Sequence, residues 1–432
     1  MADPSEATAG PESASPWRGR RLPLAALLAF VCALVVPAVL GGADATQQHR
    51  DMVRFHLPRI NELLQDPSSW AAPSAVAATA PGHHAVLAAA AWLRGRSAVA
   101  PDDLPVRLLN AAAAPALALA LWWLLGRWTG RTWRTALLAA TVAGSHYVVT
   151  SSIWINTDAA ALLLYVVALS CAVASPRRPV STGLALGGLV LWRQMYAPAA
   201  LAASWLAARR GSPHAHRAAA ATGLPAAILL GLLAWTWGGA TPPTGQATNT
   251  LGLYPIGLLH GFALLGLLTV PFAGFARGGP LPPRAVLAWS ALLALGLWLA
   301  VPSVPDPAAG RWASLVWTLA EASPGAGSRT LSTLLLAWLG LVAFWVVGRA
   351  GPDQELAPEA LLLLGCLAGA SLQPFAWQRY AEPAILVTLA VASARRAEGA
   401  SRWSWLGPLG FLAAYSTATQ LRVWGVVGPV VG

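Results

Sequence analysis

Apolar runs of close to twenty residues recur along almost the whole chain, and short arginine clusters separate them. A helix needs about 20 apolar residues to cross a bilayer. Only 10% of the 432 residues are charged. A soluble domain carries about 25% charged residues, so this chain lacks the polar surface that a water-soluble fold of its size requires. The sequence predicts an all-α polytopic membrane protein with a single bundle of about 11–13 transmembrane helices.

The arginine clusters follow every second predicted span and therefore share one side of the membrane. They lie at 18–21, 127–134, 177–178, 209–217, 277–284, 349 and 395–402. The opposite side collects the acids Asp51, Glu62, Asp66, Asp102, Asp103, Asp158, Asp306, Glu321 and Glu382. Cationic loops stay in the cytoplasm, so the N-terminus is predicted inside and the acids outside. The pI near 10.8 is then a topology signal, and we expect no nucleic-acid partner.

The domain organisation follows from these spans. Residues 1–21 are predicted to form a disordered cytoplasmic N-terminus, and residues 22–425 a single transmembrane domain. The first apolar run, 22–40, is long enough to span, although a cationic flank before an apolar core also describes a signal peptide. Later spans are predicted at 104–125, 135–153, 156–175, 181–195, 196–208, 218–238, 254–276, 284–302, 330–348, 358–373, 381–394 and 403–425.

The longest polar interval, residues 43–103, is the predicted first external loop. Helix-like stretches at 55–65 and 82–94 lie within it, and prolines punctuate it. The second stretch is too short to cross the membrane, so we expect a helix in the interface. The three cysteines, Cys32, Cys171 and Cys366, all fall inside apolar runs, which argues against a disulfide framework.

Several charged groups stand where the bilayer makes them unusual. A charge near the bilayer centre costs at least about 2.5–3.5 kcal/mol and normally faces a cavity or a partner. Arg193, on the predicted outer side, is either a snorkelling interfacial residue or a phosphate clamp, since guanidinium offers a planar fork of donors. Asp158 opens a span and is either a helix cap or a functional acid. Arg379 stands one helical turn before Glu382, so an Arg–Glu pair is its simplest interpretation.

The stretch from His49 to Pro58 is the densest group of ionisable residues beside a predicted span. His56 within it is either a polar tip on an interfacial helix or part of a reactive site. His83 and His84 either line the mouth of such a site or form the end of an interfacial helix. The histidine spacing matches no ordinary zinc motif, so neither a metal nor a cofactor is expected.

Together these motifs resemble the GT-C membrane glycosyltransferases, and among them the family of the dolichyl-phosphate-glucose-dependent alpha-1,2-glucosyltransferase. The matching stretches are Phe55-His56-Leu57-Pro58, Thr79-Ala80-Pro81-Gly82-His83-His84, Asn156-Thr157-Asp158, Trp192-Arg193-Gln194 and Arg379-Tyr380-Ala381-Glu382-Pro383. They occur in the family's order, and all lie on the predicted outer side. The family's acidic pair, four and three residues before the histidine, is replaced here by Met52 and Val53, so Asp51 is the nearest acid.

The resemblance implies an inverting enzyme, the Ala- and Arg-rich composition suggests a bacterial relative in a plasma membrane, and the charge pattern predicts an outward-facing site. It would move a sugar from a polyprenyl-phosphate donor to the hydroxyl of a glycan or lipid acceptor. Such a transfer needs a base for the acceptor proton. Asp51 is the leading candidate, with Glu62 and Asp158 as alternatives, and His56 would orient the acid or contact a substrate.

The resemblance further implies that Arg193 and Arg379 bind the phosphate, while Gln194 and Tyr380 contact the sugar or support the arginines. Two other classes remain open from the sequence. A polytopic transporter or flippase of lipid-linked sugars would also need many spans and a membrane-level arginine. A noncatalytic assembly protein is the third possibility. Polar groups crowded at the external ends of spans favour chemistry at the interface.

Overall fold

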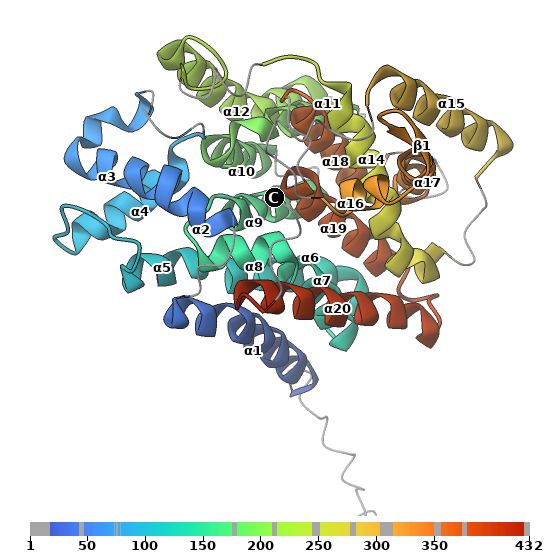
Figure 1. Cartoon of the computed structure of the whole chain (residues 1–432), viewed down its shortest axis with the longest axis horizontal. Coiled ribbons are helices and arrows are strands. Elements are labelled where there is room, and N and C mark those ends of the chain that lie inside the picture. The colour runs from blue at the N-terminus through green and yellow to red at the C-terminus, as the bar shows by residue number, and fades with distance from the viewer. Residues whose placement is uncertain are drawn as a thin grey trace, which may run out of the picture.

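The computed structural model describes residues 18–42, 47–72, 74, 77, 79–174, 179–209, 214–243, 251–276, 282–302, 314–349, 356–373 and 378–426. These residues form an almost entirely helical molecule (Figure 1). The first half contains α1 (Arg18–Gly41), α2 (Gln47–Asp51), η1 (Met52–His56), α3 (Leu57–Gln65), η2 (Pro67–Ala71), α4 (Gly82–Leu93), α5 (Leu104–Ala111), α6 (Ala113–Thr129), α7 (Trp133–Ala143), α8 (His146–Ile153), α9 (Asp158–Ala174), α10 (Pro179–Trp192), η3 (Gln194–Tyr196) and α11 (Ala197–Arg209).

The second half contains α12 (Ala215–Trp237), α14 (Pro255–Thr269), η4 (Val270–Ala276), α15 (Arg284–Ala300), α16 (Leu315–Glu321), α17 (Leu331–Val347), α18 (Pro358–Ala370), α19 (Gln378–Arg395), η6 (Arg402–Trp405) and α20 (Leu406–Val423). Two short strands, β1 (Gly325–Ala326) and β2 (Arg329–Thr330), pair in an antiparallel hairpin before α17. The sequence did not predict α16 or this hairpin.

Among the described residues, four helices are long and apolar enough to cross a membrane. They are Arg20–Gly41, Leu104–Thr129, Ala215–Trp237 and Pro255–Ala276. The pair α7 and α8 counts as a fifth if its two halves, bent by 65°, form one span. Other apolar helices are shorter, such as the 13-residue α18. The chain is therefore an α-helical membrane protein, while the count of thirteen spans stays a prediction.

The predicted helix boundaries hold closely in places and shift in others. The interfacial stretch predicted at 82–94 is α4, whose 12 residues are too few to cross. The first helix begins at Arg18, so the last residues of the segment predicted as disordered are helical. Arginine is a good helix former, and the first turn needs no helical partners for its amides. Residues 1–17, the rest of that segment, lie outside the described residues.

The centre of the bundle is α19, which is buried along almost its whole length. It packs against α6, α7, α9, α14 and α18. A helix that is apolar on every face belongs in the interior of a bundle. Its 18 residues give an axis of about 27 Å. The side chains at its two ends are therefore far apart from one another.

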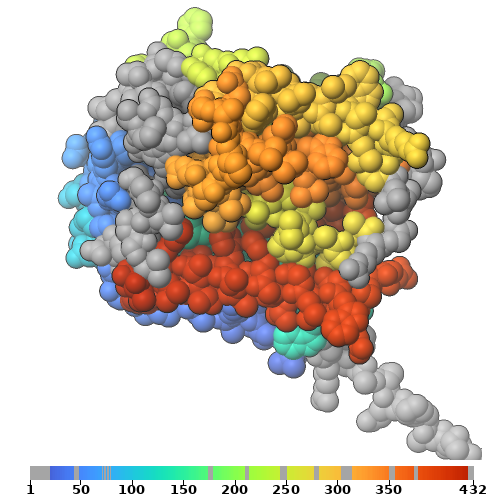
Figure 2. Space-filling view, turned by 45° about the vertical axis from the view of Figure 1, so that its right-hand side comes forward, coloured from blue at the N-terminus to red at the C-terminus, as the bar shows by residue number. Residues whose placement is uncertain are grey.

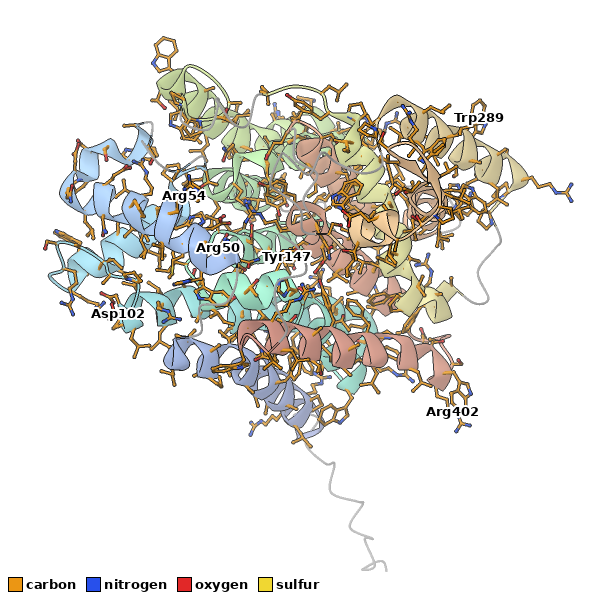
Figure 3. The ribbon with its side chains drawn as sticks, in the orientation of Figure 1. Arg50, Arg54, Asp102, Tyr147, Trp289 and Arg402 are labelled. Atoms are coloured by element: carbon orange, nitrogen blue, oxygen red, sulfur yellow. The ribbon has the colours of Figure 1, made fainter. Side chains whose placement is uncertain are left out.

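Arginines from three of the predicted clusters, 18–21, 127–134 and 395–402, meet at the end of the bundle where α19 finishes. The guanidinium of Arg395 lies 5.1 Å from the ring of Trp128 in α6, and Arg134 donates to the carbonyl of Ala397 at 3.5 Å. Arg131 lies within electrostatic reach of Arg20 and Arg127. We call this the basic end. Figure 3 shows Arg402 on one side of the molecule and Asp102, in the first polar interval, on the other. These three clusters, far apart in the sequence, thus share one end of the bundle, and the side of the membrane on which they lie stays a prediction.

Candidate active site

The polar stretch after the first span is a continuous helix with a wider turn inside it. The amide of Leu57 donates to the carbonyl of Met52, five residues earlier, so η1 is a π-helical turn between α2 and α3. Residues five apart are rotated by roughly 140° in an α-helix, but a π turn brings them nearly in line. Asp51 and His56 are separated by five, and both are buried, with 6% and 7% of their surface exposed. The π turn lets both side chains face the bundle, while Val53 and Arg54 remain exposed.

Asp51 forms an ion pair with an arginine from the far end of the chain. A guanidinium nitrogen of Arg379 lies 2.7 Å from a carboxylate oxygen of Asp51. Their side chains are 13% and 9% exposed. Because Arg379 lies in the first turn of α19, the pair locks the start of the central helix to the helix that contains η1. The simplest interpretation from the sequence, an Arg379–Glu382 pair, is therefore wrong.

Glu382 instead points into the bundle and binds neutral partners. It accepts hydrogen bonds from Gln378 and, at 2.7 Å, from the hydroxyl of Tyr415 in α20. Gln378 in turn accepts from the amide of Leu315 at 2.7 Å. These contacts tie the first turn of α19 to α16 and α20. No local pattern indicates this network, because its members come from segments that are far apart in the sequence.

A second ion pair joins Asp158 and Arg193. Asp158 lies in the first turn of α9, where a negative charge is favourable. Arg193 follows the last residue of α10 in an extended conformation, with φ −151° and ψ 104°, so the chain leaves the helix at this residue. The two side chains are 4% and 6% exposed. Each charge compensates the other in a place where one alone would be costly.

Tyr380 lies between the two arginines. Its ring centroid is 5.1 Å from the guanidinium carbon of Arg193 and 5.4 Å from that of Arg379. An aromatic ring stabilises cations at such distances. The five residues Asp51, Arg379, Tyr380, Arg193 and Asp158 form one contiguous group, which we call the double ion pair. It contains four of the charged residues that the sequence singled out.

The histidines pack beside this group. Nδ1 of His56 and Nε2 of His84 are 2.9 Å apart, and the ring of His83 meets that of His84 edge-on at 5.9 Å. Burial, followed by the charges of His83, Arg379 and Arg193, holds the pKa of His56 well below its ordinary value. Burial also lowers the pKa of His84 well below the usual value and that of His83 to about 4. All three rings are therefore neutral at pH 7, and one ring of the His56–His84 pair donates to the other.

Gln194 and Glu62 make contacts that brace the loops around the group. The side-chain oxygen of Gln194 accepts from the amide of Ala80 at 2.9 Å and so fixes η3 to the segment before α4. Glu62 pairs with Arg59 at 2.8 Å and accepts from Ser74 at 2.9 Å. Among the described residues, Glu62 forms no ion pair or hydrogen bond with the double ion pair, so the structure separates it from the other candidate bases.

Asn110 is a positioning residue that the sequence did not indicate. Its side-chain amide donates to the carbonyls of Ser151, Ser152 and Trp154 at 2.9–3.1 Å. These carbonyls end α8, and the chain continues directly to Asp158 at the start of α9. A single asparagine at the edge of an apolar run gives no local signal of such a clamp.

The charged members of the double ion pair are all largely buried. Within the described part of the chain, no group of three or more histidine, cysteine or acidic residues is arranged to hold a metal ion. The comparisons with protein-family models, with curated proteins and with solved structures found no match to this chain. The double ion pair and the histidines beside it are therefore the basis for a functional proposal.

Proposed function

We propose that this protein transfers a sugar, a hexose, from a polyprenyl-phosphate donor to an acceptor hydroxyl at the outer face of a bacterial plasma membrane. The observation that carries the proposal is the double ion pair: two arginines beside one tyrosine ring, each neutralised by its own carboxylate, at the end of the bundle opposite the basic end. The arrangement offers a dianionic or monoanionic phosphate two cations, and it offers the acceptor two acids.

Phosphate binding would exchange partners within this group. A lipid-linked phosphate that takes Arg193 and Arg379 releases Asp158 and Asp51 from their ion pairs. Guanidinium donates bidentately to phosphate oxygens, which makes it a suitable partner for a phosphate leaving group. The charge that develops on the leaving oxygen then meets two fixed cations in a site with little water, where such interactions are strongest.

The freed carboxylate of Asp51 is the proposed base. It takes the proton of the acceptor hydroxyl as that oxygen bonds to the anomeric carbon, while the bond from this carbon to the phosphate oxygen breaks. The phosphate leaves with the electron pair, and the anomeric configuration inverts in this single displacement. Neutral His56, beside the arginines, is suited to hydrogen-bond the acceptor or the sugar. We propose that the bundle, together with its interfacial helices, has the GT-C-like fold that the resemblance implies.

The test uses the full chain in vesicles with a radiolabelled polyprenyl-phosphate hexose and a glycan or lipid acceptor fraction. Asp51→Asn and Arg379→Lys should each lower transfer by about 100-fold or more, since each removes a group that acts on the transition state. Arg94→Ala is the matched control, because Arg94 forms an ion pair with Asp103 in the same polar interval, away from the site. Unchanged transfer by correctly inserted Asp51→Asn and Asp158→Asn variants would contradict the proposed base.

One observation favours a second function, a flippase for lipid-linked sugars. The 65° bend between α7 and α8 breaks a potential span, and broken helices are typical of transporters. The same vesicles distinguish the two functions. Movement of a labelled lipid-linked sugar between leaflets without glycan transfer, abolished in the Arg193 and Arg379 variants, would support the flippase and reject the transferase.

A further inference from the structure

A groove lies between α15 and α17, far from the double ion pair. The two helices are antiparallel: the indole of Trp298 donates to the carbonyl of Thr330 at 2.9 Å, and that of Trp338 to the carbonyl of Leu287 at 3.3 Å. Figure 2 shows both helices side by side at the surface, in yellow and orange. The cavity between them has a volume of about 370 Å³, and such volumes are typical of small-molecule sites.

The groove is lined mostly by apolar and aromatic side chains and opens at the surface of the molecule. Leu293, Leu341 and Phe344 form its walls, and Trp289 stands at its edge. Trp289 is 71% exposed, and Leu292 on the next turn is 58% exposed. Trp289 lies at the outer edge of the molecule (Figure 3). An apolar face of this extent on a membrane protein contacts hydrocarbon, so the natural occupant of the groove is an acyl chain.

A cation stands at one end of this apolar groove. The guanidinium carbon of Arg349 lies 3.7 Å from the ring centroid of Trp345, and both residues line the cavity. This is the basic end of the bundle, because Arg396, next to Arg395, donates to the carbonyl of Val346 at 2.7 Å. An arginine at the headgroup level above an apolar groove complements a lipid with a negative head and a hydrocarbon tail. Basic pockets between helices on the cytoplasmic side bind the headgroups of anionic lipids.

We propose that the groove between α15 and α17 is a binding site for an anionic phospholipid of the inner leaflet. One acyl chain lies along Leu293, Leu341 and Phe344, and the phosphate contacts Arg349. The indole of Trp345 holds this guanidinium in place, so little side-chain freedom is lost on binding. The site is at the opposite end of the molecule from the double ion pair, and the proposal does not depend on the proposed transferase activity.

Native mass spectrometry of the purified full chain tests the site, with phosphatidylglycerol and phosphatidylcholine of identical chains as probes. The wild type should retain one phosphatidylglycerol at least about fivefold more than phosphatidylcholine. Arg349→Gln should remove that preference, and Ser290→Phe, which fills the groove, should lower retention of both lipids. Arg402→Gln is the control, because Arg402 stacks on Trp403 at the same end but does not line the groove.

Three results would overturn the proposal: equal retention of the two lipids, the same loss in the Arg349→Gln and Arg402→Gln variants, or full retention by a folded Ser290→Phe variant. Millimolar inorganic phosphate is included as a competitor. If it displaces the lipid completely, the site binds a phosphate group alone and the acyl groove is not part of it.

Discussion

Two buried arginines of this bundle are accommodated by pairing each with one carboxylate. Arg193 and Arg379 each lie against a carboxylate and both approach Tyr380. Breaking a buried pair by removing one partner typically costs about 3–5 kcal/mol, because it leaves the other charge uncompensated. Arg→Lys and Asp→Glu, which keep both charges, are therefore the least disruptive variants at these positions, and Asp→Asn is informative only where the variant inserts correctly.

The buried histidines make the fold sensitive to acid. With a folded-state pKa of about 4, His83 stays neutral at a pH where an unfolded chain would bind a proton at a pKa near 6.5. The unfolded state then binds more protons, so stability falls as the pH drops below about 6.5. For His83 alone, the loss between pH 7.5 and pH 5 is about 2 kcal/mol.

His83→Gln should therefore weaken the fall in melting temperature between pH 7.5 and pH 5, measured for the protein in detergent. His216→Gln provides the control, since His216 is exposed at the start of α12. An acid shift of equal size in both variants would show that His83 does not contribute.

At the scale of helices, close approach of backbones decides which elements pair. A Cβ added at Gly340 of α17 would collide with the carbonyl of Phe262 in α14, and one added at Gly266 with the carbonyl of Leu336. Small residues allow such crossings in membranes, where packing is the main attraction between helices. The α14–α17 crossing therefore depends on both glycines.

Gly340→Ala should lower stability by about 1–3 kcal/mol, because the two backbones must separate. Gly296→Ala in α15 meets open space and should raise stability by about 0.5–1 kcal/mol through the higher helix propensity of alanine. Melting temperatures of the two variants in detergent should move in opposite directions. A neutral effect of Gly340→Ala would mean that the crossing adjusts without cost.

Local sequence patterns predict some of these elements but not others. Apolar periodicity predicts a single span over 135–153, but Ser145 is extended, with ψ 154°, and splits it into α7 and α8. The π turn at η1 likewise has no pattern of its own. Partner choice is the hardest property to predict: Glu382 stands near Arg379 in sequence, yet Arg379 binds Asp51, from which 328 residues separate it. Long-range packing, not local spacing, selects that partner.

At the scale of the whole molecule, the distribution of charge along the sequence indicates which loops lie at the same end of the bundle. Three of the predicted arginine clusters, 18–21, 127–134 and 395–402, meet where α19 ends, and the candidate residues Asp51, Asp158, Arg193 and Arg379 meet where it begins. Successive helices cross the bundle in opposite directions, so every second loop lies at the same end. Roles within the site stay predictions, since spacing fixes neither the base nor the sugar.

Sidedness is testable by cysteine labelling in intact cells. The native cysteines at 32, 171 and 366 lie within helices and are replaced by alanine to remove background. Gln65→Cys, at the exposed end of α3, should react with a membrane-impermeant maleimide added outside. Glu398→Cys, exposed at the basic end, should react only after permeabilisation. The reverse pattern would place the double ion pair in the cytoplasm.

The order in which the two ion pairs can form has a consequence for biogenesis. Asp158 and Arg193 belong to consecutive helices and can meet as soon as that hairpin leaves the ribosome. Asp51 is synthesised early, but its partner emerges only with α19, near the end of translation. Nascent chains stalled before α19 should therefore hold a lone carboxylate at the membrane surface and remain substrates for quality-control proteases, so that completion of the reactive group coincides with completion of the protein.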